Sequence, residues 1–183
     1  MAPAVDGRRG RGRASEVPEE ARTVARTEKI AVGGMLQTRG LVLIQVLGAR
    51  KGPGVAGRTL STLGHNGINV IGVASFADIH ELGNICFAIN KDDLDQALGL
   101  LQTIKEEIRA EKIDYLRNCC SVSIYGPHFS ERPSIAGRMF DAIAEAGIDI
   151  HMISTSISTV SCVIAEDRLQ AAVEKLKDYF LVP

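Results

Sequence analysis

The 183 residues include 21 basic and 22 acidic side chains, so a net charge of −1 gives the chain no overall attraction for nucleic acid or an anionic membrane. The length suits one ordinary domain or two small ones and is sufficient to bury a hydrophobic core. The longest apolar stretch, residues 41–47, is interrupted by Gln45 and is far too short to span a bilayer. We therefore expect a globular protein whose partners include neither nucleic acid nor a membrane.

Residues 1–26 differ in composition from the rest of the chain. They hold six arginines and four acidic residues among glycine, alanine and proline, with few large aliphatic side chains. Such a segment cannot bury enough apolar surface to offset the chain entropy lost on folding, so we predict a disordered tail. An RNA contact or a transit peptide is the alternative interpretation of the arginine-rich run, but the interspersed glutamates argue against both.

The remaining chain contains an internal repeat. Residues 53–58 align with residues 133–138 at an offset of 80, and residues 67–70 align with residues 147–150 at the same offset. A repeat of this length indicates two copies of a small domain rather than a solenoid of short units.

Each copy is predicted to fold as strand, helix, strand, strand, helix. In the first copy these are a strand over 41–47, a helix that opens at Pro53 and is capped by Gly67, strands over 68–75 and 84–90, and a helix from Asp92. In the second copy they are a strand over 121–125, a helix that opens at Pro133 and is capped by Gly147, strands over 148–155 and 160–165, and a helix from Asp167.

A ferredoxin-like βαββαβ module needs one further strand per copy. The first copy has a β-rich segment for it at residues 112–117. The second copy ends in residues 181–183, which we judge too short for a strand, whereas residues 29–33 are β-rich and unassigned. We therefore predict that the early segment closes the second sheet, so that the first copy is inserted within the second.

The predicted fold class is α+β, with antiparallel sheets and helices on one face. The predicted boundaries are a tail over 1–26, a first domain over 39–117, and a second domain over 27–38 plus 118–183.

The cysteines (Cys86, Cys119, Cys120 and Cys162) contain no Cys-x-x-Cys pair and no metal-ligand spacing. Because the adjacent pair does not suit a disulfide framework, a reduced compartment is favoured, cytosolic or an organelle matrix, and we predict a cytoplasmic location. Cys86 and Cys162 alternate with core positions and are expected to be buried. The four histidines are dispersed, so we predict no metal and no cofactor.

Two motifs give the chain a resemblance to a known family. Pro-Gly-Val-Ala at 53–56 and Ala-Gly-Ile-Asp-Ile-His-Met-Ile-Ser-Thr-Ser at 146–156 resemble the tandem ACT regulatory region of aspartate kinases. The resemblance covers residues 27–182 and implies two ACT domains. In that family a small amino acid such as lysine or threonine binds between ACT domains and regulates the kinase allosterically.

The resemblance does not extend to a catalytic domain. No G-x-x-x-x-G-K-[ST] motif is present, and the scattered serines and histidines define no triad. We therefore predict a non-catalytic regulatory chain whose partner is an aspartate kinase catalytic chain or another biosynthetic enzyme.

The candidate ligand site is the tight Gly/Pro loop that precedes the first helix. Backbone N–H groups at a helix N-terminus suit the carboxylate of a free amino acid, whereas in the structural alternative the glycines and proline only make the turn. The resemblance implies a site that spans two chains of a homodimer. Its residues would be Lys51, Gly52, Pro53, Gly54, Val55, Ala56, Asn69 and Ser75, with Asp149 and Ile150 from the second copy of the partner chain.

Three of these positions depart from the family pattern. Lys51 replaces an acidic residue, Ser75 replaces a glutamine, and Asp149 replaces an asparagine. Either Lys51 and Asp149 pair and close the site, or Asp149 binds the ligand's ammonium while Lys51 adds to carboxylate binding. A different class of function also remains, in which the ACT dimer is a protein–protein docking scaffold without a ligand. In the second copy, Ser134 is expected to cap its helix, and that loop is interpreted as structural.

Overall fold

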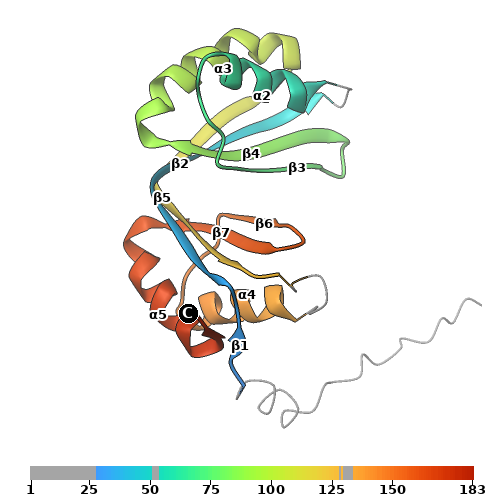
Figure 1. Ribbon diagram of the computed structural model, residues 1–183. Coiled ribbons are helices and arrows are strands. Elements are labelled where there is room, and N and C mark those ends of the chain that lie inside the picture. Colours follow the sequence, from blue (N-terminus) through green and yellow to red (C-terminus); the bar gives the residue numbers. More distant parts are fainter. Residues whose placement is uncertain (1–27, 51–53, 128, 130–133) are drawn as a thin grey trace, which may run out of the picture.

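The computed structural model describes residues 28–50, 54–127, 129 and 134–183. Within them a six-stranded sheet has the order β3-β4-β2-β5-β7-β6, and a small separate sheet pairs β1 with β8 (Figure 1). The strands are β1 (Ile30–Ala31), β2 (Gly34–Arg50), β3 (Gly72–Ala77), β4 (Leu82–Asn90), β5 (Lys112–Tyr125), β6 (Met152–Thr155), β7 (Thr159–Ala165) and β8 (Phe180–Leu181). The α-helices are α2 (Val55–His65), α3 (Leu94–Ile108), α4 (Ile135–Glu145) and α5 (Leu169–Tyr179), with short 3₁₀ turns η1 (Lys91–Asp93) and η3 (Glu166–Arg168) before α3 and α5.

Two long strands, β2 and β5, run through both halves of the molecule. The later part of β2 pairs with β4 and with the start of β5, whereas residues 34–38 pair antiparallel with residues 121–125. The sheet therefore has a first half of β3, β4, β2 and β5 and a second half of β6, β7, β5 and β2. Figure 1 shows α2 and α3 on the outer side of the first half and α4 and α5 on the outer side of the second. The two halves are called the first and second unit below.

Strand alternation builds three apolar clusters. On the helix side of the first unit, Val42, Ile44 and Val46 of β2 are fully buried beneath α2 and α3. The second unit has its own cluster beneath α4 and α5. A third cluster occupies the helix-free faces between the units; it contains Leu41, Leu43, Ala88, Cys119, Met152 and Val163. Cys162 is buried as predicted, and Cys86 is half-buried against the third cluster.

The glycine caps predicted for the first helix of each copy are confirmed. Gly67 has φ +79° and Gly147 has φ +63°, a left-handed backbone that favours glycine. After each cap the chain folds back, and Ile68 N–H donates to the Leu63 carbonyl as Ile148 N–H donates to the Ile143 carbonyl. The following strands begin later than predicted, at Gly72 and Met152, because residues 68–70 and 148–150 form no regular structure and a bend precedes each strand.

The prediction for the strand that closes the second sheet is wrong in its residues. Ile30 and Ala31 pair in parallel with Phe180 and Leu181, so the C-terminal segment that we judged too short does form a strand. Its anchor is Phe180, which is 1% exposed. The segment that pairs with residues 121–125 is instead 34–38, the beginning of β2.

None of the helices in the described residues has the length and apolar character needed to cross a membrane.

Gly48 and Gly99 are expected to respond oppositely to alanine. Gly48 lies at a β2 bulge with φ +66°, and a Cβ there would be 2.7 Å from Glu111 Cδ. Gly99 lies in α3 with open space around it. Gly48→Ala should lower the free energy of unfolding by about 1–2 kcal/mol, whereas Gly99→Ala should raise it by about 0.5–1 kcal/mol. Urea unfolding measures both, and a neutral Gly48→Ala would contradict the strain.

Candidate functional site

The N-terminus of α2 is open to solvent. Gly54 precedes the helix with φ +102°, and its carbonyl accepts a hydrogen bond from Arg58 N–H at 2.7 Å. Among the described residues, no side chain caps the helix and no atom lies within 4 Å of the place where a Cβ on Gly54 would be. The first-turn N–H groups and the positive end of the helix dipole can therefore receive an anion such as a carboxylate. Val55 is half-buried and Ala56 is exposed; the predicted Lys51, Gly52 and Pro53 lie outside the described residues.

Arg58, one turn into α2, does not add a free positive charge to this helix end. Its Nε donates to Glu107 Oε2 of α3 at 2.9 Å, and both side chains are about half exposed. An exposed pair of this kind contributes little to stability but fixes where the guanidinium lies. An anion at the α2 N-terminus therefore depends on backbone N–H groups rather than on Arg58.

Of the other residues predicted in the first copy, Ser75 lies at the same end of the unit as Gly54 and Asn69 does not. Ser75 pairs with Ile85 of β4, near the end of the sheet where β2 runs toward α2. Asn69 follows the opposite end of α2, whose eleven residues span about 16 Å. Both side chains are exposed. The structure thus groups Ser75, and not Asn69, with the open helix end of its own chain.

Asp149 and Ile150 lie in the turn between α4 and β6 of the second unit. Asp149 is exposed, and Ile150 packs against the second unit's core. Asn69 lies in the corresponding connection of the first unit, between α2 and β3. The strands that follow these connections, β3 and β6, lie together, because a Cβ on Gly72 would be 3.2 Å from Met152 Cε. One chain therefore holds the predicted residues as two groups, one at the α2 N-terminus and one at the junction of the units.

The expected cap at the second loop is wrong. Ser134 occupies the N-cap position of α4, but its side chain makes no capping hydrogen bond. Its backbone is already helical, with φ −85° and ψ −9°, whereas a capping serine needs an extended backbone to reach the first-turn N–H groups.

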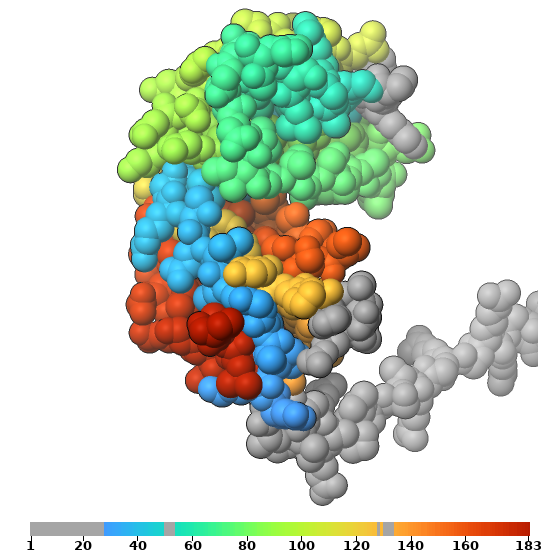
Figure 2. Space-filling model, viewed as in Figure 1, coloured from blue at the N-terminus to red at the C-terminus, as the bar shows by residue number. Residues whose placement is uncertain are grey.

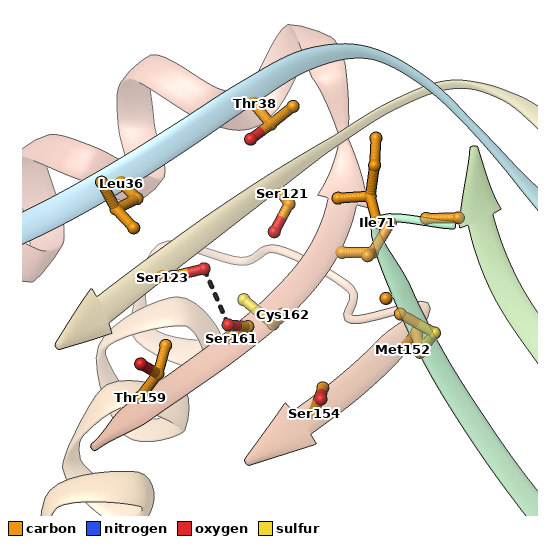
Figure 3. A pocket seen from close by; sticks show the side chains of 13 residues that line it. Leu36, Thr38, Ile71, Ser121, Ser123, Met152, Ser154, Thr159, Ser161 and Cys162 are labelled. Atoms are coloured by element: carbon orange, nitrogen blue, oxygen red, sulfur yellow. Dashed lines mark hydrogen bonds between the residues drawn. The ribbon is translucent and has the colours of Figure 1, made fainter. Parts of the chain in front are cut away.

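The structure also contains a cavity that the sequence did not predict. A hollow of about 260 Å³ lies on the helix-free side of the second unit (Figure 3). It is lined by Leu36, Thr38, Ile71, Gly72, Ala88, Ser121, Ser123, Met152, Ser154, Thr159, Ser161, Cys162 and Val163. Its residues come from six segments of the chain, so no local sequence motif predicts it. The one sequence signal is the alternation of serine with core residues over 121–125.

The buried cysteines are held as neutral thiols. Burial raises the pKa of Cys162 to about 12, and burial, followed by the nearby Glu166 carboxylate, raises the pKa of Cys120 to about 11. Neither thiol supplies a thiolate nucleophile or metal ligand near neutral pH. Among the described residues, no group of three or more histidine, cysteine or acidic side chains is placed to hold a metal ion.

The raised pKa of Cys162 predicts a loss of stability at alkaline pH. Its ordinary value is 9.0, so between about pH 9 and pH 12 the unfolded chain has released a proton that the native thiol retains. The contribution to the free energy of unfolding is complete below pH 9 and falls as pH rises toward 12. Urea unfolding should show that the free energy of unfolding falls less steeply with pH in Cys162→Val than in the unaltered protein across this range. The difference in slope should correspond to about one proton. Equal slopes in the two proteins would contradict the prediction.

The antiparallel sheet, with helices packed against its outer face, belongs to the α+β class and fits the ACT-type ferredoxin-like fold. A family model of the ACT domain matches residues 122–180. An aspartokinase of Bacillus sp. (strain MGA3) is 34% identical over 120 residues, which are 66% of this chain and 29% of that protein. Aspartokinase 2 of Bacillus subtilis (strain 168) is 28% identical over 178 residues, or 90% of this chain and 43% of the relative. The chain spans less than half the length of these curated relatives.

Two solved structures are similar over nearly their whole length. The ligand-free regulatory subunit of aspartate kinase from Thermus thermophilus has a TM-score of 0.75 and 26% identity, covering 82% of this chain and 99% of that one. A chain from a crystal structure of aspartokinase alpha and beta subunits has a TM-score of 0.74 and 30% identity, covering 81% and 99%. The chain belongs to the ACT-domain family and is related to the regulatory regions of aspartate kinases, which confirms the resemblance of its motifs.

Proposed function

We propose that this chain is a non-catalytic regulatory subunit that binds a free amino acid between two copies of itself and thereby regulates an aspartate kinase catalytic chain or a related biosynthetic enzyme. The observation that carries the proposal is the uncapped, solvent-open N-terminus of α2 in a chain of this family. Every free amino acid carries the carboxylate that such a helix end attracts. The cytoplasm is the location that this role and the reduced cysteines favour.

The proposal includes two ACT domains, the first (39–117) inserted in the second (27–38 plus 118–183). The pairing of residues 34–38 with residues 121–125 supports it, because this pairing gives the second unit a strand from the chain that precedes the first unit. Each unit then has the strand order 2-3-1-4 expected of a ferredoxin-like module, provided that residues 34–38 are counted as the fourth strand of the second unit.

The need for two copies follows from the two groups of predicted residues. Asp149 can supply a charge for the ligand's ammonium, but within one chain it lies in the other unit from Gly54. A homodimer in which the second unit of one copy abuts the α2 end of its partner would bring the carboxylate and ammonium sites together. Sedimentation velocity should give twice the chain mass.

A thermal-shift screen against the twenty amino acids tests the ligand. A ligand at a hundredfold over its dissociation constant adds about 2.7 kcal/mol of stability, or about 5–11 °C for a chain of this size. Asp149→Ala should abolish the shift because the ammonium loses its partner. Asp167→Ala is the matched control, because Asp167 is another exposed aspartate in the same unit.

The docking scaffold is the second candidate, favoured by the apolar side chains at the β3–β4 turn. Phe76 is 62% exposed and Ile79 is 93% exposed, which suits contact with another protein. A flat amino-acid panel from a protein of confirmed dimer mass would overturn amino-acid sensing and favour the scaffold. A coupled ATP–aspartate assay on the chain alone should show no turnover; turnover would overturn the non-catalytic assignment.

A further inference from the structure

The hydroxyl-lined cavity described above lies between the two units. The space-filling view is hollowed between the β3–β4 hairpin of the first unit and the β6–β7 hairpin of the second (Figure 2). Ile71, Gly72 and Ala88 of the first unit line the cavity together with residues from β2, β5, β6 and β7 of the second. Anything bound there touches both units at once.

The polar side chains that line the cavity, apart from the Cys162 thiol, are all hydroxyls. Ser123, which is 8% exposed, donates its hydroxyl to Ser161 Oγ at 2.7 Å (Figure 3). Four more hydroxyls line the same space and have no hydrogen-bond partner within the described part of the chain; they belong to Thr38, Ser121, Ser154 and Thr159. Each can both donate and accept, so together they offer a set of unused hydrogen bonds that face one volume.

The two ends of the cavity are apolar. Ile71 and Met152 lie at one end, at the junction of the units, and Leu36, which is 56% exposed, lies at the other end (Figure 3). No charged side chain lines the cavity. A charged ligand would lose its hydration there without gaining a counter-charge, which is costly. A free amino acid, with two charges, therefore does not fit this cavity, and the site is chemically different from the α2 N-terminus.

We propose that the cavity binds a small uncharged molecule with hydroxyl groups along one side and a short apolar chain on the other, a diol or polyol in class. The volume of about 260 Å³ corresponds to roughly nine water molecules at their liquid volume, so the ligand is small. Its hydroxyls satisfy those of Ser121, Ser154 and Ser161, and its apolar part packs on Met152. Because it contacts both units, it stabilises their packing against each other.

Methionine methyl signals provide a direct test with 1,2-hexanediol as the probe. In protein labelled with ¹³C at the methionine methyls, the Met152 signal should shift saturably as 1,2-hexanediol is added. Met139, which is fully buried in α4 on the opposite face of the sheet, should not respond. Hexanoate and lysine at equal concentration should leave Met152 unchanged.

Substitutions separate a specific site from general solvent effects. Ser161→Ala and Ser154→Ala should each weaken 1,2-hexanediol binding by about three- to tenfold, because each removes one hydrogen-bond partner. Ser61→Ala, at an exposed position of α2, should bind as the unaltered protein does. The proposal is overturned if Met152 shows no saturable shift, if hexanoate shifts it equally, or if both cavity variants bind with unchanged affinity.

Discussion

Phe180→Ala is expected to lower the free energy of unfolding by about 3–5 kcal/mol. The side chain is 1% exposed and lies in the second unit's core, beneath the α4–α5 side of the sheet. The substitution removes its buried surface and leaves a cavity that the surrounding strands cannot close. It also weakens the pairing with Ile30, which holds β1 to the end of the chain.

Leu181→Ala is the matched control, one residue further along the same strand. Leu181 is 54% exposed, and its carbonyl, which accepts a hydrogen bond from Val32 N–H at 3.1 Å, survives the change. Its cost should be within about 0.5 kcal/mol. Urea denaturation followed by circular dichroism measures both variants. Similar losses for the two would show that the segment contributes through its backbone rather than through the Phe180 ring.

Leu43→Ala is expected to cost about 2–5 kcal/mol and to loosen the two units from each other. Leu43 is 1% exposed, on the helix-free side of β2, in the cluster that also contains Met152 and Val163 of the second unit. Leu116, its register partner on β5, is 43% exposed, and Leu116→Ala should be nearly neutral.

A double-mutant cycle tests whether this cluster couples the units. If Leu43 and Met152 support each other, the double alanine variant should differ from the sum of the single variants by about 0.5–3 kcal/mol. An additive result would mean that the helix-free faces meet without energetic coupling. Equal losses in Leu43→Ala and Leu116→Ala would contradict the burial argument itself.

The parts of the fold that were predictable are those that local chemistry determines. The glycines at 67 and 147 end their helices because both stand at left-handed positions, and the alternation at Val42, Ile44 and Val46 marks a buried strand. The strand at residues 34–38 was missed because Gly-Met-Leu-Gln-Thr carries little apolar alternation. Only its pairing with residues 121–125, distant in sequence, makes it a strand.

The candidate site was predictable in part for the same reason. The open helix end at Gly54 follows from a local glycine loop, and the sequence predicted it. The separation of Asn69 from Ser75 depends on where α2 ends relative to β3, which is a property of packing. The cavity depends on the approach of Ile71 to Met152 across two units, for which the chain carries no local signal.

The pairing of the chain's early and late strands has a consequence for its synthesis. Residues 41–90, with their partners at 112–119, can form the first unit's sheet while later residues are still being made. The edge of β2 at residues 34–38 has no pairing partner until residues 121–125 have been synthesised. Ile30 likewise cannot pair until Phe180 has been synthesised. A bare strand edge invites pairing with another chain. A chain that stops after residue 120 would therefore expose residues 34–38 as an unpaired strand edge, which favours aggregation.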